Sequence, residues 1–221
     1  MLEQKVIITS DGSTSIHLEE WNESYHSKHG AIQEAYHVFI KNGLSLFKGK
    51  SVSVLEVGFG TGLNALITLK EAQTYTQSID YVGVEAYPLS NEVARQMNYV
   101  HKLDCDLAAE FALFHSTEWE KKHSITDTFS LTKVNKKFQE IDFKDEFDLI
   151  YFDAFGFRVQ PELWSIAIFR LMYQALKNDG VLVTYACRTS IKNAMIEAGF
   201  SIEKLPGAPG KREMLRAVKK L

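Results

Sequence analysis

The stretch Val52-Ser53-Val54-Leu55-Glu56-Val57-Gly58-Phe59-Gly60-Thr61-Gly62 joins a short apolar run to three glycines at alternate positions. Its first six residues are rich in β-branched side chains and are typical of a buried strand. The residues that follow, 63–72, predict a helix. Glycines let the backbone turn tightly between the two elements, and they let a ligand approach the N–H groups at the helix N-terminus. The stretch therefore predicts a strand, loop and helix that hold a ligand.

The alternation of strand and helix continues along the chain. Further strands are expected at residues 81–84, 129–134, 148–152 and 181–185, and further helices at 31–44, 162–176 and 190–198. Such alternation implies a parallel sheet that is covered on both faces. A hairpin is expected in the first 20 residues, helices and loops at 91–127, and a closing hairpin at 201–205 and 213–218. The expected fold is a Rossmann-like α/β domain with a mostly parallel seven-stranded sheet, an antiparallel C-terminal strand and a small N-terminal extension.

The chain has 221 residues, which predicts a single domain with an extension or lid at 1–48 and a core at 49–221. No apolar run approaches the ~18 residues of a membrane span, and the first residues lack a secretory signal pattern, so a cytoplasmic location is expected. Cys105 and Cys187 are too few for a disulfide framework or a metal cluster. The net charge of −3 does not by itself indicate a nucleic-acid binder.

Two acids beside the glycine loop indicate which ligand it holds. Glu85 ends the next strand, 23 residues beyond Gly62, where a carboxylate can accept both hydroxyls of a ribose. Nicotinamide dehydrogenases share that feature, but their G-x-G-x-x-G pattern would require a glycine at the bulky Leu63. Glu56 would repel a pyrophosphate and suits the ammonium group of a methionine moiety. The pattern favours S-adenosylmethionine and a class I methyltransferase over a glycine turn without a ligand.

A second motif, Asp153-Ala154-Phe155-Gly156, follows the strand at 148–152. In open α/β sheets ligands bind beyond the carboxyl ends of the strands. A carboxylate there can accept a hydrogen bond from a substrate amine, and Phe155 can stack on a planar base. An ordinary Asp has a pKa of about 3.9, so we expect Asp153 mainly to orient the amine and stabilise charge, with proton removal secondary. The plain alternative is an Asp that caps a turn.

The spacing of His26, His29 and His37, with Glu34 nearby, allows a zinc site. Gly30 interrupts this segment and no activated-water motif accompanies it, so no metal is expected. Helix capping or packing at the edge of the core is the simpler explanation of these histidines. The segment also precedes the first strand of the core, a place where methyltransferases often carry a lid over the cofactor.

Several segments, taken in order, resemble the methyltransferase part of the MnmC family. Besides the loop at 56–64 they are Asp11–Ser13, Tyr25–Ser27, His29–Ala31 with Glu34, Phe152–Phe155, Gln160–Trp164, Pro206-Gly207 and Pro209–Met214. The resemblance covers most of the chain, and the combination is far more specific than any single segment.

The resemblance implies an activity on tRNA, namely methylation of the aminomethyl group at position 5 of the wobble uridine, which is often 2-thiolated. In two-domain members a flavin-dependent oxidase first removes a carboxymethyl group. This chain is too short for that oxidase and has no second glycine fingerprint, so a stand-alone, MnmD-type methyltransferase is expected. Asp153 would face the aminomethyl group. The expected contacts to S-adenosylmethionine are Tyr25, Glu56, Gly58, Phe59, Gly60, Thr61, Gly62, Asn64, Glu85 and Ala86.

Two positions depart from the family pattern. Gly156-Phe157 stands where a small residue and a proline usually follow the Asp-x-Phe motif. Cys187-Arg188-Thr189-Ser190 stands where a Lys-Gly pair is expected, so the resemblance transfers a basic RNA contact to Arg188. A patch formed by Arg188, Lys211 and Arg212 would suffice for a weak, salt-dependent grip on tRNA. Asn135 is the candidate for the contact to adenine.

Three functions therefore remain open. The first is a tRNA wobble-uridine N-methyltransferase, the second a small-molecule N-methyltransferase on the same fold, and the third a non-catalytic partner that binds the cofactor. The intact loop at Glu56 together with Asp153 argues against the third. The choice between the first two rests mainly on the resemblance, and the sequence does not indicate the oligomeric state.

Overall fold

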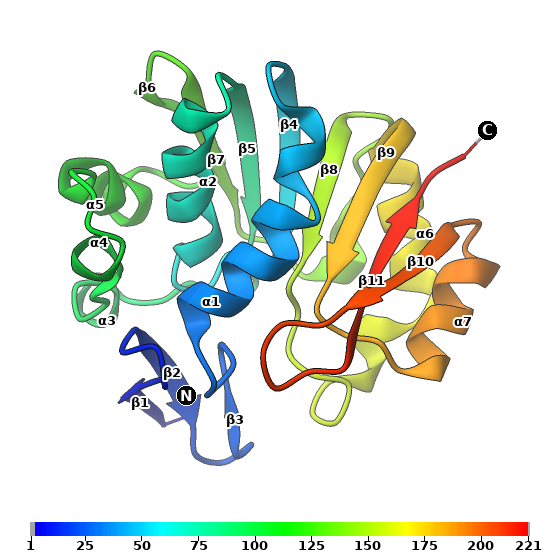
Figure 1. Cartoon of the computed structure of the whole chain (residues 1–221), viewed down its shortest axis with the longest axis horizontal. Coiled ribbons are helices and arrows are strands. Elements are labelled where there is room, and N and C mark those ends of the chain that lie inside the picture. Colours follow the sequence, from blue (N-terminus) through cyan, green and yellow to red (C-terminus); the bar gives the residue numbers. More distant parts are fainter. Residues whose placement is uncertain (1–2, 221) are drawn as a thin grey trace.

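The computed structural model of the chain describes residues 3–220 and has an eight-stranded sheet at its centre (Figure 1). The strands of this sheet are β4 (Ser51–Val57), β5 (Ser78–Val84), β6 (Lys122–Thr126), β7 (Phe129–Val134), β8 (Phe147–Phe152), β9 (Leu176–Thr184), β10 (Ser201–Pro206) and β11 (Glu213–Val218). A separate three-stranded sheet consists of β1 (Gln4–Ile8), β2 (Thr14–Leu18) and β3 (Glu23–Ser24).

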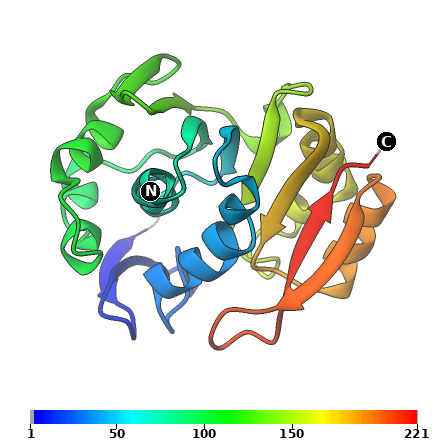
Figure 2. The same cartoon turned by 45° about the horizontal axis from the view of Figure 1, so that its top comes forward.

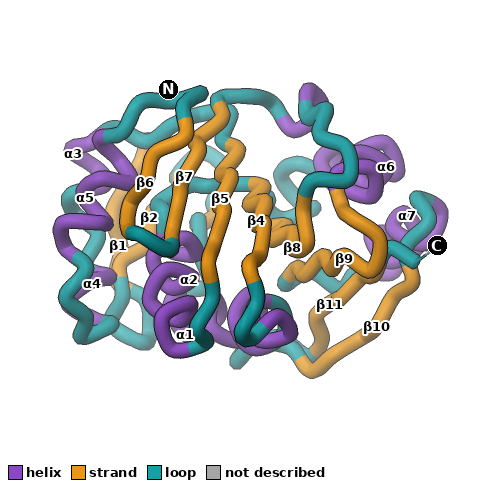
Figure 3. The backbone as a smooth tube through the Cα atoms, turned by 90° about the horizontal axis from the view of Figure 1, so that it is seen from above, coloured by secondary structure: helices purple, strands orange, loops and turns teal. Residues whose placement is uncertain are grey.

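Helices cover both faces of the large sheet. They are α1 (Ala31–Ala35), α2 (Leu63–Thr74), α3 (Asn91–Ala94), α4 (Tyr99–Lys102), α5 (Ala108–Ser116), α6 (Ile166–Ala175) and α7 (Thr189–Glu197), with shorter turns η1 (Tyr36–Lys41), η2 (Leu44–Phe47), η3 (Phe138–Glu140) and η4 (Pro161–Trp164). Seen from above, α1 and α2 lie on one side of the sheet and α6 on the other (Figure 3). No helix within residues 3–220 is long and apolar enough to cross a membrane.

The two faces are built from alternate side chains of the same strands. In β4, Val54 packs into the core beneath α1 and α2, and its neighbour Leu55 packs into the core beneath α6 and α7. Successive residues of a strand point to opposite faces, so a strand buried on both sides must be apolar throughout. The continuous apolar runs in this sequence therefore correspond to central strands.

The strand order is β10-β11-β9-β8-β4-β5-β7-β6, and β4 lies parallel to both β5 and β8. From β4 the chain continues to β5 on one side and returns later to β8 on the other side. The loops that follow β4 and β8 therefore lead away from each other at the carboxyl ends of these strands. Open α/β sheets form their ligand-binding crevice at such a switch point. The small sheet β1–β3 lies below these strand ends in Figure 1.

The structure confirms the expected fold class, with one strand more than expected. The additional strand is β6, which pairs antiparallel with β7 inside the segment predicted to be helices and loops. Its sequence, Lys-His-Ser-Ile-Thr, contains a single apolar residue, Ile125, because β6 is an edge strand whose other side chains are exposed or half-buried. An edge strand of this kind lacks the apolar pattern on which the prediction relies.

Several predicted elements have different bounds in the structure; β5, for example, begins at Ser78 and not at 81. The helix expected at 31–44 is divided into α1, the wider π-helical η1 and the turn η2, and Asn42 donates from its side chain to the His37 carbonyl at this break, 2.7 Å away. The helix expected at 162–176 becomes η4 followed by α6, which begins after its N-cap Ser165. The strand expected at 181–185 begins earlier, at Leu176, so Gly180 lies inside β9.

Truncation of Phe169 tests the core beneath α6. Its ring is fully buried and lies 5.3 Å from the ring of Phe152 and 6.4 Å from that of Trp164. We expect Phe169→Ala to lower the free energy of unfolding by about 3–5 kcal/mol, because a large apolar side chain leaves a cavity. Chemical denaturation measures the change. The control Ile196→Ala, at a half-exposed position on α7, is expected to change it by less than about 0.5 kcal/mol, and equal losses would contradict this assignment of the core.

Candidate active site

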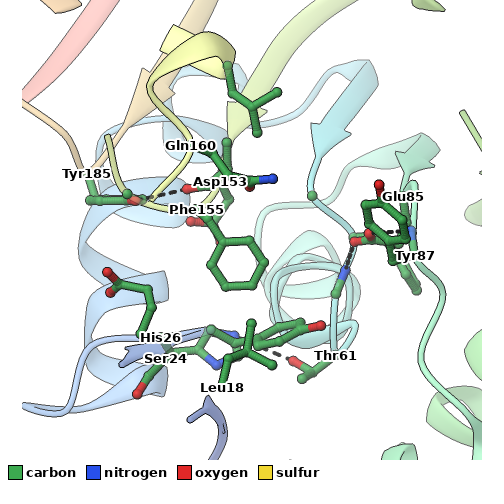
Figure 4. A pocket seen from close by; sticks show the side chains of 18 of the residues that line it. Leu18, Ser24, His26, Thr61, Glu85, Tyr87, Asp153, Phe155, Gln160 and Tyr185 are labelled. Atoms are coloured by element: carbon green, nitrogen blue, oxygen red, sulfur yellow. Dashed lines mark hydrogen bonds between the residues drawn. The ribbon is translucent and has the colours of Figure 1, made fainter. Parts of the chain in front are cut away.

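A cavity of ≈ 1740 Å³ lies at the carboxyl ends of β4, β5 and β8. Its walls come from the glycine loop, the loop after β8, the segment 18–28 with helix α1, and the loop before β11. Figure 4 shows the ring of Phe155 pointing into this space, with Glu85 on one side and Tyr185 on the other. Segments far apart in the chain thus share one cavity.

The glycine loop passes close to the backbone of the loop after β8. Gly58 has a φ of +98°, and a Cβ at this position would lie 2.7 Å from the carbonyl oxygen of Asp153. Only glycine combines this backbone conformation with so close an approach. The amide of Asp153 in turn donates to the carbonyl of Val57 at 3.0 Å. The two loops are therefore packed against each other, backbone to backbone.

Glu85 lies at the end of β5 and faces the glycine loop. Its Oε2 accepts a hydrogen bond from the Gly60 amide at 3.0 Å, and its Oε1 accepts one from the Tyr87 amide at 2.9 Å. Burial raises the pKa of Glu85, against the lowering effect of these amides. Each carboxylate oxygen has a second lone pair, which leaves acceptors for the hydroxyls of a ribose. Ala86 follows on the same wall.

Asn64, in the first turn of α2, joins two acids that belong to neighbouring strands. Its Nδ2 donates to Glu56 Oε1 at 2.8 Å and to Asp153 Oδ2 at 2.9 Å. Its Oδ1 is buried and has no hydrogen-bond partner among the residues that the structure describes. Buried polar atoms nearly always have a partner, so this oxygen is an acceptor available to a donor in the cavity.

Glu56 is buried at the base of the cavity, where its Oε2 also accepts a hydrogen bond from the Tyr81 hydroxyl at 2.8 Å. Burial raises the pKa of Glu56 well above its ordinary value, while the hydrogen bonds from Asn64 and Tyr81 lower it. The sequence did not indicate these two partners. In the structure Glu56 is an acid supported from within the protein, beneath the loop.

Asp153 has an altered acidity, which corrects the expectation of an ordinary Asp. Burial raises its pKa to about 7, and the carboxylate of Glu34 acts in the same direction. The hydrogen bond from Asn64 and the charge of Lys211 lower it. A carboxylate with a pKa near neutrality can accept a proton at physiological pH, which favours general-base chemistry. Proton removal by Asp153 is therefore chemically feasible here.

Phe155 is fixed by aromatic neighbours and by the backbone around it. The centre of its ring lies 5.6 Å from that of Trp21 and 5.0 Å from that of Tyr25, and both pairs are T-shaped. Trp164 Nε1 donates to the Phe155 carbonyl at 2.8 Å. Arg158 further along the loop donates to the Trp21 carbonyl at 2.9 Å and forms an ion pair with a carboxylate of β3. The N-terminal segment thus holds the loop after β8 in place.

The segment that contains the histidines closes the cavity over the glycine loop. His26 Nε2 lies 3.5 Å from Thr61 Oγ1, which accepts a hydrogen bond from the Tyr99 hydroxyl at 3.0 Å. Burial lowers the pKa of His26 to about 4, so its ring is neutral at pH 7. His37 Nε2 donates instead to the Pro206 carbonyl, and His29 packs against Gly210. No group that could hold a metal ion occurs among residues 3–220.

The structure brings most of the predicted site residues to the cavity, and three lie elsewhere. On its walls are Tyr25, Glu56, Gly58, Phe59, Gly60, Thr61, Asn64, Glu85, Ala86, Asp153, Phe155 and Lys211. Gly62 lies just behind the loop as the N-cap of α2. Arg188 lies outside, with its guanidinium 5.0 Å from the Phe157 ring, and Arg212 is exposed.

Several wall residues were not predicted to belong to the site. Tyr185 directly follows β9, and the strand-end position was the signal that could have identified it. Glu34 belonged to the segments that resemble the MnmC family and to the possible zinc site, and it was not predicted to line the cavity. Residues 137–139 line the cavity. The side-chain amide of Asn135 donates a hydrogen bond to the carbonyl of Glu85 at 2.8 Å. Asn135 is not among the residues that line the cavity, and its contact to adenine stays a prediction.

The residues present fit S-adenosylmethionine. The backbone at Gly58 leaves a cradle that a Cβ would fill, the buried Oδ1 of Asn64 offers an acceptor to an ammonium group, and Glu85 offers acceptors to a ribose. Gly58, Asn64 and Glu85 all line the same cavity.

Comparisons with known proteins agree with this geometry. Residues 97–220 match the sequence profile of the family described as "S-adenosyl-L-methionine-dependent methyltransferase". The chain is 27% identical over 212 residues to the tRNA 5-methylaminomethyl-2-thiouridine biosynthesis bifunctional protein MnmC of Leptospira interrogans, with 89% of this chain and 32% of that protein covered. The corresponding values for MnmC of Aromatoleum aromaticum are 29% identity, 96% and 35%. The chain thus spans about a third of the length of these relatives.

Solved structures show the same fold. MnmC2 from Aquifex aeolicus has a TM-score of 0.79 at 24% identity, covering 100% of this chain and 72% of that chain. Spermidine synthase from Thermotoga maritima has a TM-score of 0.63 at 17% identity, covering 99% and 70%. At these identities the likeness establishes the fold, a class I methyltransferase arrangement, and leaves the substrate to the chemistry of the site.

A methyl group added at Gly58 tests the close packing of the two loops. We expect Gly58→Ala to weaken S-adenosylmethionine binding about tenfold or more, because its Cβ would displace the loop from Asp153. Isothermal titration calorimetry measures the affinity. Gly49→Ala is the matched control, since Gly49 also has a left-handed φ, +73°, but no atom within 4 Å of the added Cβ. It should lower stability and leave the affinity unchanged; an equal loss of affinity in both variants would refute the interpretation.

Proposed function

The chain belongs to the S-adenosyl-L-methionine-dependent methyltransferase family, and from this we propose that it methylates the 5-aminomethyl group of the tRNA wobble uridine, with or without 2-thiolation. The observation that carries the proposal is the partly buried Asp153, placed directly after β8 with a pKa of about 7. The names of the MnmC relatives, which refer to 5-methylaminomethyl-2-thiouridine biosynthesis in tRNA, support this choice of acceptor.

The chemistry of the cavity suits a cationic amine attached to a flat base. Carboxylates line the cavity on several sides, among them Glu34, Glu56 and Asp153. Such a wall attracts an ammonium group, since opposite charges interact more strongly when they are shielded from water. The ring of Phe155 points into the same space and offers a face to the uracil ring (Figure 4).

In the proposed reaction Asp153 binds the amine and takes up the proton that the nitrogen loses. S-adenosylmethionine, when bound, supplies a methyl group on a positively charged sulfur. Asn64 donates to Asp153 Oδ2 and thereby fixes the direction of the carboxylate. Phe155 and Tyr25 hold the base and exclude water from the reacting nitrogen. Positioning of this kind contributes roughly 7–11 kcal/mol in favourable cases.

The other contacts are part of the same proposal. The cofactor is held by the glycine loop, Asn64, Glu85, Ala86 and Tyr25, and the exposed Arg188 and Arg212 contact tRNA phosphates outside the cavity. The chain acts as one methyltransferase domain, with residues 1–48 as a lid and 49–221 as the core. A tRNA substrate implies that the protein works in the cytoplasm.

Transfer of labelled methyl groups to tRNA tests the acceptor. The full chain is incubated with labelled S-adenosylmethionine and tRNA from a strain that retains the 5-aminomethyl group on its wobble uridine, and the tRNA is then digested to nucleosides. We expect label in the wobble nucleoside alone, because the cavity fits an amine on a flat base. Label in small amines added to the assay, and none in tRNA, would exclude the proposed acceptor.

Replacement of Asp153 tests the proposed base. We expect Asp153→Asn to retain cofactor binding and to lower the methylation rate by about 10²-fold or more, because the amide cannot accept the proton. In the unchanged protein the carboxylate is protonated below its pKa of about 7, so the rate should fall as the pH falls below 7. Single-turnover rates from pH 5.5 to 9 measure this dependence. Asp142→Asn, at an exposed position, is the control, and a full rate in Asp153→Asn would rule out the role.

A further inference from the structure

The loop between β10 and β11 reaches across the end of the sheet to helix α1 (Figure 2). Lys211 in this loop forms an ion pair with Glu34 of α1, and both side chains are largely shielded from water. The ammonium group also lies 3.8 Å from the centre of the Tyr185 ring, a cation–π contact. All three side chains line the cavity that contains Asp153.

The backbone of this loop is shaped to hold Lys211 in that place. A Cβ at Gly207 would lie 2.5 Å from the Lys211 carbonyl, and Gly210 has a left-handed φ of +84° beside the ring of His29. The Pro206 carbonyl accepts a hydrogen bond from His37 Nε2 at 2.8 Å. The loop is therefore anchored to the N-terminal segment at both of its ends. A lysine held in this way is poorly placed to reach an RNA phosphate.

Tyr185 connects this lysine to the loop that carries Asp153. Its hydroxyl donates to the carbonyl of Ala154 at 2.8 Å, directly after Asp153 in the chain. The side chain of Glu34 is held on its other oxygen by the amide of Ser27 at 3.1 Å. Elements from the start, middle and end of the chain thus meet beside one carboxylate.

We propose that Lys211 is a positioning residue, which together with Glu34 and Tyr185 forms a charge-balanced clamp that fixes the acceptor loop and sets the charge around Asp153. The proposal rests on the function proposed above, in which Asp153 receives the acceptor amine. It replaces the expectation that Lys211 contacts the tRNA backbone. It also gives Glu34 a role, as the anion that the lysine balances.

The charged and titratable groups that interact with Asp153 come from several elements. Glu34 of α1 raises the pKa of Asp153 and Lys211 before β11 lowers it. The charge of Asp153 in turn raises the pKa of Glu56 of β4, Tyr81 of β5 and Tyr185 after β9. Lys211 supplies the positive charge in this set. Its removal leaves Glu34 uncompensated near Asp153 and favours the protonated acid, whereas neutralising Glu34 favours the carboxylate. Removal of both charges should nearly cancel.

An NMR titration of the full chain, labelled with ¹³C at its Asp carboxyl carbons, tests the clamp without tRNA or cofactor. The spectrum of Asp153→Asn identifies the Asp153 signal. We expect Lys211→Met to raise the pH at the midpoint of the Asp153 titration by roughly one unit and Glu34→Gln to lower it. The double variant should return the midpoint close to its original value. Lys50→Met, at an exposed position at the opposite end of β4, loses the same charge and should leave the midpoint unchanged.

Rates of tRNA methylation give the second measurement. We expect the pH–rate profile of Lys211→Met to shift to higher pH, with about a tenfold loss below the midpoint and recovery above it, and Lys211→Arg to restore most of the rate. Two results would contradict the proposed clamp. One is a loss of methylation rate in Lys211→Met that is the same at every pH, and the other is an Asp153 titration midpoint in Lys211→Met equal to that in Lys50→Met. If the unaltered protein transfers no methyl group to tRNA, the proposed function fails, while the titration still decides for or against the clamp.

Discussion

The side-chain amide of Asn64 lies between a buried and a partly buried carboxylate, and the site depends on this arrangement. Glu56 is the last residue but one of β4 and Asp153 directly follows β8, so the register of two parallel strands brings the two acids to the same edge of the sheet. Two carboxylates that lie so close together repel each other, and a shared donor at 2.8 and 2.9 Å relieves part of that repulsion. Since Asn64 belongs to the first turn after the glycine loop, the cofactor loop and the acceptor loop are held by one group.

The remaining walls are contributed by the two ends of the chain. The segment around Tyr25 and His26 covers the glycine loop, and the loop before β11 reaches α1 through Lys211 and Glu34. The first segment lies outside the large sheet, and the second is the loop between β10 and β11. Their contacts with each other and with the loop after β8 convert an open crevice into a partly enclosed cavity. Enclosure excludes water and strengthens every electrostatic interaction inside.

Burial also explains how an ordinary side chain acquires an unusual acidity. Removal of a carboxylate from water disfavours its charged form, and this effect outweighs the opposing hydrogen bond and lysine at Asp153. The result is a group that changes protonation near neutral pH. Proton transfer is most effective when the pKa of the base is close to the working pH. The acidity of the site is thus a property of the assembled walls.

The sequence by itself determined the fold class, the strand–glycine–helix unit and the positions of Glu56, Glu85 and Asp153 at strand ends, because these follow from local patterns of apolar residues and glycines. It did not reveal β6, whose exposed edge position leaves almost no apolar pattern. The tertiary structure alone decided that Asn64 bridges Glu56 and Asp153, that Lys211 pairs with Glu34, 177 residues away, and that Asp153 titrates near pH 7. These features depend on distances and on desolvation between segments remote in the chain, and no local pattern encodes either quantity.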